Sequence, residues 1–453
     1  MTATRRRRLL ALALVPALAA LAACGGDDGG DAGGGGDAGG GGNAAACEPS
    51  DGEVTLTFTS WVPGIDAAVD LWNEQNSDVQ VQLQTGPAGN AGTYQNFFNA
   101  LQAGDAPDLG QIEFDTLPNF RVQDGLVDIG GCEGVAEAAD SFVDWTWQQV
   151  TFGEDDAVYA IPQDTGPMAM YYRADLFEAA GIEVPTTWDE YAEAARAIQA
   201  QGAFITHFPQ RDVNWFAGLV WQAGGQWFGN DGEAWEVTLT SPESTQVAEY
   251  WQGLADEGLV ANLQGFSEEW NNALNTGQVW TWVSAVWGNN TIVTNAPDTA
   301  GLWQVAPMPQ WEEGASAAGN WGGSTTAVFQ GTDHPYEAAQ FALWLNTDEE
   351  ALTLLNEGGG LYPATTAGLD LPALQEGEEF FGGQEIFDVF AEASGEVDPD
   401  FVWGPTMTQT YNDIADGFGP ALGGSGTFVD ALSSAEQTTV EALEAQSIPV
   451  AGE

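Results

Sequence analysis

Residues 159–191 restrict the possible folds most strongly, because the order of their secondary-structure elements can be predicted without a gap. The run Met168–Tyr172 is apolar at consecutive positions, which predicts a strand buried on both faces. Adjacent strand residues point to opposite faces, so we expect one of Tyr171 and Tyr172 in the core and the other partly buried. Such a strand belongs inside a covered sheet.

Helices are predicted directly after that strand. Residues 174–180 predict a short helix that ends at Gly181, because glycine takes the left-handed conformation of a helix cap at little cost. Thr187, with Glu190 three residues later, makes a capping box that begins the next helix. An apolar stripe continues that helix towards Gly202.

The N-terminal part of the ordered chain alternates strands with helices. Strands are predicted at 54–58, 79–83 and 109–112, with helices at 65–74 and 94–103 between them. This βαβαβ order predicts a mainly parallel sheet with helices on its faces. In such sheets ligands bind at the carboxyl ends of the strands.

Three side chains are therefore predicted at that edge of the sheet. Trp61 follows the first strand, while Glu113 and Asp115 end the third. An aromatic face and two carboxylates would meet there. The alternatives remain open at this point: Trp61 could cover the core, and either acid could simply be solvated, as most of the 67 acidic residues must be.

The central stretch resembles the extracellular solute-binding proteins (family 1) of sugar ABC importers. The resemblance rests on Pro162–Gly166 before the strand, Tyr171–Phe177 after it, and Pro185–Tyr191 at the next helix. It implies a non-enzymatic protein that closes around a sugar and delivers it to a membrane permease, with no cofactor and no metal. The likeness extends over residues 54–446.

The resemblance also implies an α/β fold, the two-lobed clamshell of type II periplasmic-binding proteins, with three segments crossing between lobes. It places the N-terminal lobe at 47–164 and 325–362 and the C-terminal lobe at 165–324 and 363–453. Closure would be driven by a ligand that contacts both lobes. We expect a monomer.

Further motifs of the family locate the expected ligand-binding residues. In Gly277–Asn290 the final aromatic, Trp287, resembles the ring that stacks on the sugar, with Trp282 as second choice. Residues 319–329 resemble the return crossing, where Gly322 and Gly323 would allow close backbone approach or act only as turn glycines. The predicted ligand-binding residues are Trp61, Glu113, Asp115, Gln163, Asp164, Thr165, Trp282, Trp287, Trp321, Gly322, Gly323 and Trp403.

The first 46 residues predict export and anchoring rather than fold. Arg5–Arg8 followed by the apolar run 9–23 is typical of a signal peptide, through either the general or the twin-arginine route. Small residues before Cys24 resemble a lipobox, which implies a lipid anchor on that thiol. Residues 24–46, rich in Gly and Asp, are expected to be a flexible tether.

Two cysteines remain if Cys24 carries lipid. Cys47 opens the ordered part of the chain and Cys132 lies in its N-terminal region. An oxidising exterior would let them form a disulfide, although two free thiols are the alternative.

Charge excludes some partners and predicts a salty environment. The chain contains 8 Lys+Arg and 67 Asp+Glu, and four of the arginines precede residue 9, so the mature charge is 4 − 67 = −63. Nucleic acid is excluded as a partner by repulsion from its phosphates. Such charge destabilises a fold at low salt and is screened at high salt, which indicates a halophilic protein.

Other functional classes are compatible with the acidity. A secreted glycoside hydrolase needs only a suitably spaced pair of carboxylates. A polyamine- or cation-binding protein would use the same charge, but does not explain 19 tryptophans. The chain has only two histidines, His207 and His334, which leaves little for a triad or a histidine metal site.

Overall fold

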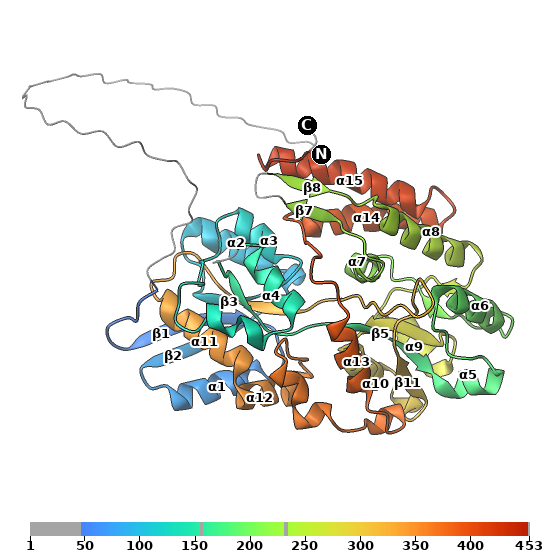
Figure 1. Cartoon of the computed structure of the whole chain (residues 1–453), viewed down its shortest axis with the longest axis horizontal. Helices are drawn as coiled ribbons and strands as arrows, with labels where there is room; N and C mark the ends of the chain where they lie inside the picture. Colours follow the sequence, from blue (N-terminus) through green and yellow to red (C-terminus); the bar gives the residue numbers. More distant parts are fainter. Residues whose placement is uncertain (1–46, 155–156, 231–233, 452–453) are drawn as a thin grey trace, which may run out of the picture. The chain divides into compact units, whose positions relative to one another are not determined.

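The N-terminal strands form a five-stranded sheet in a computed structural model that describes residues 47–154, 157–230 and 234–451 (Figure 1). The strand order is β2-β1-β3-β12-β4. Its strands are β1 (Val54–Ser60), β2 (Val79–Thr85), β3 (Leu109–Glu113), β4 (Ala160–Pro162) and β12 (Ser324–Val328). The predicted parallel arrangement is confirmed for β1 with β2 and β3, whereas β12 inserts antiparallel between β3 and β4.

Helices from distant parts of the chain cover this sheet. The helices α1 and α12 lie side by side although 273 residues separate the end of α1 from the start of α12, and α11 contacts β1, β4 and β12 (Figure 1). The helices associated with this sheet are α1 (Ile65–Gln75), α2 (Thr93–Ala103), α3 (Leu117–Val122), α4 (Asp144–Thr151), α11 (Pro335–Thr347) and α12 (Glu349–Gly359). The helix α2 ends at Gly104 in a left-handed cap.

A second, three-stranded sheet has the order β10-β5-β11 and is antiparallel. Its strands are β5 (Met168–Arg173), β10 (Thr281–Ala285) and β11 (Trp303–Ala306). As predicted, Tyr171 is fully buried on β5, while Tyr172 is half-buried and donates a hydrogen bond to Gln304 Oε1.

The helices predicted after β5 are present. The helix α5 (Ala174–Ala180) ends at Gly181 with φ of 66°, and α6 (Trp188–Gln199) begins with the predicted capping box. The predicted end at Gly202 is wrong by three residues. The amide of Gly202 donates to the carbonyl of Gln199 in a tight turn, so this glycine closes the turn rather than the helix.

The remaining elements surround the second sheet. Helices α7, α8, α14 and α15 pack together, and α13 contacts β5 and β11 (Figure 1). The helices are α7 (Val213–Gln222), α8 (Pro242–Asp256), α9 (Glu268–Thr276), α10 (Gly288–Asn295), α13 (Ile386–Gly395), α14 (Met407–Leu422) and α15 (Phe428–Ala445). The short strands are β6 (Thr206–His207) with β9 (Val260–Ala261), and β7 (Phe228–Asn230) with β8 (Trp235–Val237). The 3₁₀ turns are η1 (Gly89–Ala91), η2 (Ala136–Ser141), η3 (Pro297–Thr299), η4 (Ala367–Asp370), η5 (Pro372–Leu374) and η6 (Glu379–Phe381).

The chain passes three times between the two sheets and their covering helices. It does so at 163–167 after β4, at 307–323 before β12, and at 360–385 between α12 and α13. The boundary predicted at 324/325 falls at the first residue of β12. The exact limits of the lobes stay a prediction.

A disulfide fastens the start of the ordered chain. Cys47 and Cys132 are bonded, with their Cα atoms 5.0 Å apart. The predicted signal peptide, Cys24 and the tether lie outside the described residues. Across the parts of the chain that the structure describes, no helix is both long and apolar enough to cross a membrane.

Candidate functional site

A group of packed aromatic rings lies near the end of β10 and the end of the connection that leads into β12. We call Trp270, Trp282, Trp287, Trp321 and Phe266 the aromatic wall, because each ring contacts at least one other member. The rings of Trp287 and Trp321 are 4.5 Å apart, and Trp287 Nε1 donates to the Trp321 carbonyl at 3.0 Å. Trp282 and Trp321 are buried, whereas Trp287 is only half-buried. Trp287 is therefore the predicted tryptophan of this wall with the most accessible surface.

Three carboxylates form a second group at the carboxyl ends of β3 and β4. We call Glu113, Asp115 and Asp164 the acid cluster; each is half-buried. Tyr94 OH donates to Glu113 Oε2 at 2.9 Å, and Tyr411 OH donates to Asp115 Oδ2 at 3.1 Å. Tyr411 belongs to α14, so the cluster joins elements from both ends of the chain.

Burial dominates the electrostatics of the acid cluster. Lost hydration, together with repulsion from Asp115 and Asp164, raises the pKa of Glu113 to about 8, although the Tyr94 hydrogen bond opposes the shift. Lost hydration also raises the pKa of Asp115 and of Asp164. Within the described residues the ion pairs are Arg121–Glu154, Arg173–Asp175 and Arg196–Glu257, none of which includes these acids. The cluster therefore retains unneutralised hydrogen-bond acceptors, with Glu113 able to donate when protonated.

Gly322 and Gly323 connect the aromatic wall to the acid cluster. Asp164 Oδ1 accepts a hydrogen bond from the Ser324 amide at 2.8 Å, directly after these glycines. Gly323 has φ of 92°, and a Cβ there would lie 2.8 Å from the Asp164 carbonyl oxygen. The close approach predicted for this glycine is therefore made to the protein's own backbone.

A chain of hydrogen bonds links Trp61 to Asp164. The amide of Trp61 donates to Gln111 Oε1 at 3.1 Å, and Gln111 Nε2 donates to Ser324 Oγ at 3.2 Å. Ser324 Oγ in turn donates its one proton to Asp164 Oδ1, and it lies 3.3 Å from Gln163 Oε1. Gln163 is fully buried in this network, while Trp61 is half-buried with its ring 5.7 Å from that of Tyr94.

The other predicted residues are buried near these groups. Thr165 follows Asp164, and its amide donates to the Tyr362 carbonyl. Trp403 packs on Phe401 and Trp221, with ring separations of 4.7 and 5.8 Å. Neither Thr165 Oγ1 nor Trp403 Nε1 has a hydrogen-bond partner among the described residues. Their roles as ligand contacts stay predictions.

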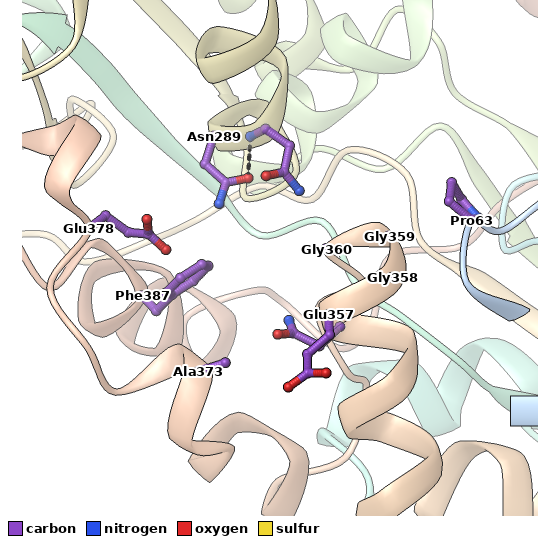
Figure 2. A pocket seen from close by; sticks show the side chains of 11 residues that line it. Pro63, Asn289, Glu357, Gly358, Gly359, Gly360, Ala373, Glu378 and Phe387 are labelled. Atoms are coloured by element: carbon purple, nitrogen blue, oxygen red, sulfur yellow. Dashed lines mark hydrogen bonds between the residues drawn. The ribbon is translucent and has the colours of Figure 1, made fainter. Parts of the chain in front are cut away.

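A pocket of about 450 Å³ lies beside the residues that follow Trp61 and Trp287 (Figure 2). This volume is within the range of small-ligand sites. Figure 2 shows Asn289 at the start of α10, Glu357 at the end of α12, and Glu378 with Phe387 approaching from the segment after α12. The lining residues are Pro63, Asn289, Asn290, Asn356, Glu357, Gly358, Gly359, Gly360, Ala373, Glu378 and Phe387.

The sequence did not predict this pocket. It did predict Trp61 and Trp287 as ligand-binding residues, and both lie two residues before a lining residue, Pro63 and Asn289. The amides, carboxylates and one phenyl ring of the pocket offer hydrogen bonds and an apolar face, and none of its lining residues is basic. In the described chain no group of three or more His, Cys, Asp or Glu side chains is arranged so that it could hold a metal ion. The chemistry of the site is that of polar recognition against aromatic surfaces.

Comparison with known proteins gives a family and several relatives. Residues 57–352 match the profile described as bacterial extracellular solute-binding protein. An arabinooligosaccharide-binding protein of Halalkalibacterium halodurans is 29% identical over 387 residues, which cover 83% of each chain.

Solved structures agree in fold. The galacto-N-biose-/lacto-N-biose I-binding protein of a Bifidobacterium longum ABC transporter, in complex with lacto-N-biose, has a TM-score of 0.79 at 27% identity, covering 89% of this chain and all of that one. An ABC-transporter-associated binding protein of B. animalis subsp. lactis, in complex with β-1,6-galactobiose, has a TM-score of 0.74 at 27% identity, with coverages of 87% and 99%. The predicted two-lobed, type II α/β fold is confirmed.

Proposed function

The chain belongs to the family of bacterial extracellular solute-binding proteins, and on that premise we propose that it binds a neutral oligosaccharide outside the cell for uptake by an ABC importer. The observation that carries the proposal is the junction of the aromatic wall with the acid cluster at Gly322 and Gly323. Relatives named for binding arabinooligosaccharides, lacto-N-biose and β-1,6-galactobiose support the same class of ligand.

The two groups match the two surfaces of a sugar. A pyranose or furanose ring has apolar C–H faces and a rim of hydroxyls. The half-buried ring of Trp287 offers a flat apolar face. The carboxylates of the acid cluster, held by tyrosine and serine hydrogen bonds, offer acceptors for the hydroxyls. A neutral ligand avoids the repulsion that an acidic one would meet.

Transport follows from closure without chemistry on the ligand. The candidate contacts lie on both sides of the three connections between the sheets. A sugar that touches both sides stabilises the closed state by its extra contacts there. The closed form of a monomer would then be the species that a membrane permease recognises, and the sugar would leave unchanged.

Rival functions predict different results. A glycoside hydrolase would convert an oligosaccharide into shorter products, whereas a polyamine-binding protein would prefer spermidine to sugars.

A thermal-shift panel tests the proposal. Arabinotriose, lacto-N-biose, β-1,6-galactobiose and spermidine would each be added to the mature protein, because a ligand that binds only the folded form raises the melting temperature. We expect a rise with at least one sugar, none with spermidine, and intact sugar afterwards by chromatography. Product formation, or a response to spermidine alone, would contradict the proposal.

The same protein is proposed to be lipid-anchored to the outer face of the cell membrane through Cys24. The support is the short apolar run that ends in small residues before this cysteine. Replacing Cys24 by Ser should abolish partitioning into a detergent phase and release the protein or leave it as precursor. Unchanged partitioning of the Cys24→Ser variant would count against the anchor.

A further inference from the structure

Phe266 combines exposure with a strained backbone. The large hydrophobic side chains exposed in the described chain are Phe266, at 48%, and Val293, at 37%. Phe266 also has φ of 61°, in the left-handed region that bulky residues rarely adopt. Such conformations are energetically unfavourable and persist where the surrounding contacts hold them. An exposed ring held at this cost calls for an explanation.

The ring of Phe266 is the outer member of the aromatic wall. Its centroid lies 6.2 Å from that of Trp287, with the planes inclined by only 35°. It also contacts Trp270 and Trp282, at 5.5 and 6.1 Å. The inner side of Phe266 therefore packs on the wall, while about half of its surface faces outward.

The loop that carries Phe266 is fastened on both sides. Ser267 Oγ donates to the Gln264 carbonyl at 2.7 Å and accepts from the Trp270 amide at the start of α9. Gly265 is buried, and a Cβ there would lie 3.1 Å from Asp212 Oδ2. These contacts fix the direction in which Phe266 presents its ring.

Polar groups flank the same loop. Asp212 is half-buried and accepts a hydrogen bond from Gln264 Nε2 at 3.5 Å. Lost hydration raises the pKa of Asp212 to about 6. His207 accepts a hydrogen bond from Trp270 Nε1 at its Nδ1, so the neutral ring carries its proton on Nε2, the atom that faces Gly265. Asp212 and Gln264 thus place a carboxylate and an amide at the loop that carries the Phe266 ring.

We propose that Phe266, with Asp212 and Gln264, forms a second sugar-contact surface beyond Trp287, so that the ligand is an oligosaccharide whose further ring lies on Phe266. This inference rests on the proposed function. A sugar fits because the surface pairs an apolar face with hydroxyl partners and is continuous with Trp287. At low ionic strength two bodies of charge −63 repel each other, which disfavours a second copy of this chain as occupant.

Chain-length dependence of affinity tests the surface. Titration calorimetry would compare arabinose to arabinotetraose and galactose to galactotriose on the mature wild type and on Phe266→Ala. We expect the variant to lose about tenfold in affinity for the trisaccharides and longer sugars, a loss typical of one aromatic contact, and less than about twofold for the monosaccharides. Phe266→Tyr, which keeps the flat face, should retain affinity. Val293→Ala is the matched control for removing an exposed apolar side chain.

The outcomes separate the two levels of inference. If the wild type binds sugars but Phe266→Ala loses equal affinity for short and long sugars, or none for either, the second surface is overturned alone. If the wild type binds no member of either series, the proposed function falls and this inference falls with it. A variant that melts at a lower temperature is compared per folded molecule, by the calorimetric stoichiometry, so that a folding defect does not imitate a loss of binding.

Discussion

Trp287 is the residue whose removal should separate binding from folding. Its ring is half-buried, and its indole N–H donates to the Trp321 carbonyl. We expect Trp287→Ala to weaken sugar binding by about 1–3 kcal/mol, the range of a desolvated aromatic contact. Calorimetric titration together with a melting curve measures both effects.

The matched variant is Trp287→Phe, which keeps a flat face but loses the hydrogen bond to Trp321. It should retain most of the affinity if stacking is the main contribution. If Trp287→Ala lowers the melting temperature sharply while affinity per folded molecule is unchanged, this ring belongs to the core alone.

Glu113 should make stability fall as pH rises. Its pKa is about 8 in the folded protein, above roughly 4.3 for an unfolded glutamate. Between these values the folded chain binds a proton that the unfolded chain does not, so the free energy of unfolding decreases as pH rises from about 4.5 to 8. Glu113→Gln removes the ionisation and should stabilise the protein by about 1–3 kcal/mol at pH 8, with little effect at pH 4.5.

Denaturant unfolding at both pH values measures this difference. The control is Glu392→Gln, which removes an exposed carboxylate on α13 and so measures the effect of removing one surface charge at each pH. Equal stabilisation by Glu113→Gln at pH 4.5 and pH 8 would show that burial does not hold Glu113 protonated.

At the scale of elements, the connection into β12 is where backbone freedom matters most. Gly322 and Gly323 both have positive φ, 87° and 92°. A Cβ on Gly323 would lie 2.8 Å from the Asp164 carbonyl oxygen and 3.0 Å from the Phe114 ring. A Cβ on Gly322 would lie no closer than 3.5 Å to its nearest neighbour, Trp287 Nε1. In both Ala variants the positive φ costs roughly 1–2 kcal/mol of backbone strain. Only Gly323→Ala adds a steric clash, with the Asp164 carbonyl oxygen.

We therefore expect Gly323→Ala to destabilise the fold by about 1–3 kcal/mol more than Gly322→Ala, in denaturant unfolding. It should also weaken sugar binding, because the collision displaces Ser324 from Asp164. Equal costs for the two variants would mean that the chain here relaxes freely.

Local patterns predicted the elements well. Several elements have a clear signal within a few residues of sequence. Apolar runs or alternation predict the strands β1, β2, β3 and β5, and a capping box predicts the start of the helix α6. The insertion of β12 between β3 and β4 has no such signal, because it pairs residues more than 160 positions apart. The end of α6 was also predicted incorrectly, at Gly202, because a glycine can close a turn as easily as it can end a helix.

Geometry alone predicted only those residues of the candidate site that lie at the ends of strands. Glu113 and Asp115 follow from the rule that ligands bind at carboxyl ends of strands. The pocket shown in Figure 2 does not follow from any rule of that kind, because Asn289, Glu357 and Phe387 meet through packing of three separate helices. The sequence also did not predict Phe266 as a site residue, because the feature that distinguishes it is a left-handed backbone conformation, which the sequence does not reveal.

At the scale of the whole molecule, like-charge repulsion should control stability. The mature chain carries 4 − 67 = −63 charges and no lysine, so four arginines cannot pair with most of its acids. Folding compresses this charge, and repulsion therefore opposes the native state more than the extended one. The Debye length falls from about 10 Å at 0.1 M salt to about 3 Å at 1 M, which nearly abolishes repulsion between neighbouring surface carboxylates.

The melting temperature should consequently rise between these concentrations by about 5 °C or more, equivalent to about 4 kcal/mol for a chain of this size. NaCl and KCl should act alike, because screening depends on ionic strength and not on the cation. Differential scanning calorimetry of the mature protein in both salts measures the effect, and the same scan in sucrose, which strengthens burial without screening charge, provides the control. Lowering the pH towards about 4 should relieve the same repulsion by protonation, at the expense of solubility. A melting temperature that stays flat up to 1 M in both salts would mean that the acids are compensated locally, for example by bound Ca²⁺, and the halophilic interpretation would then be wrong.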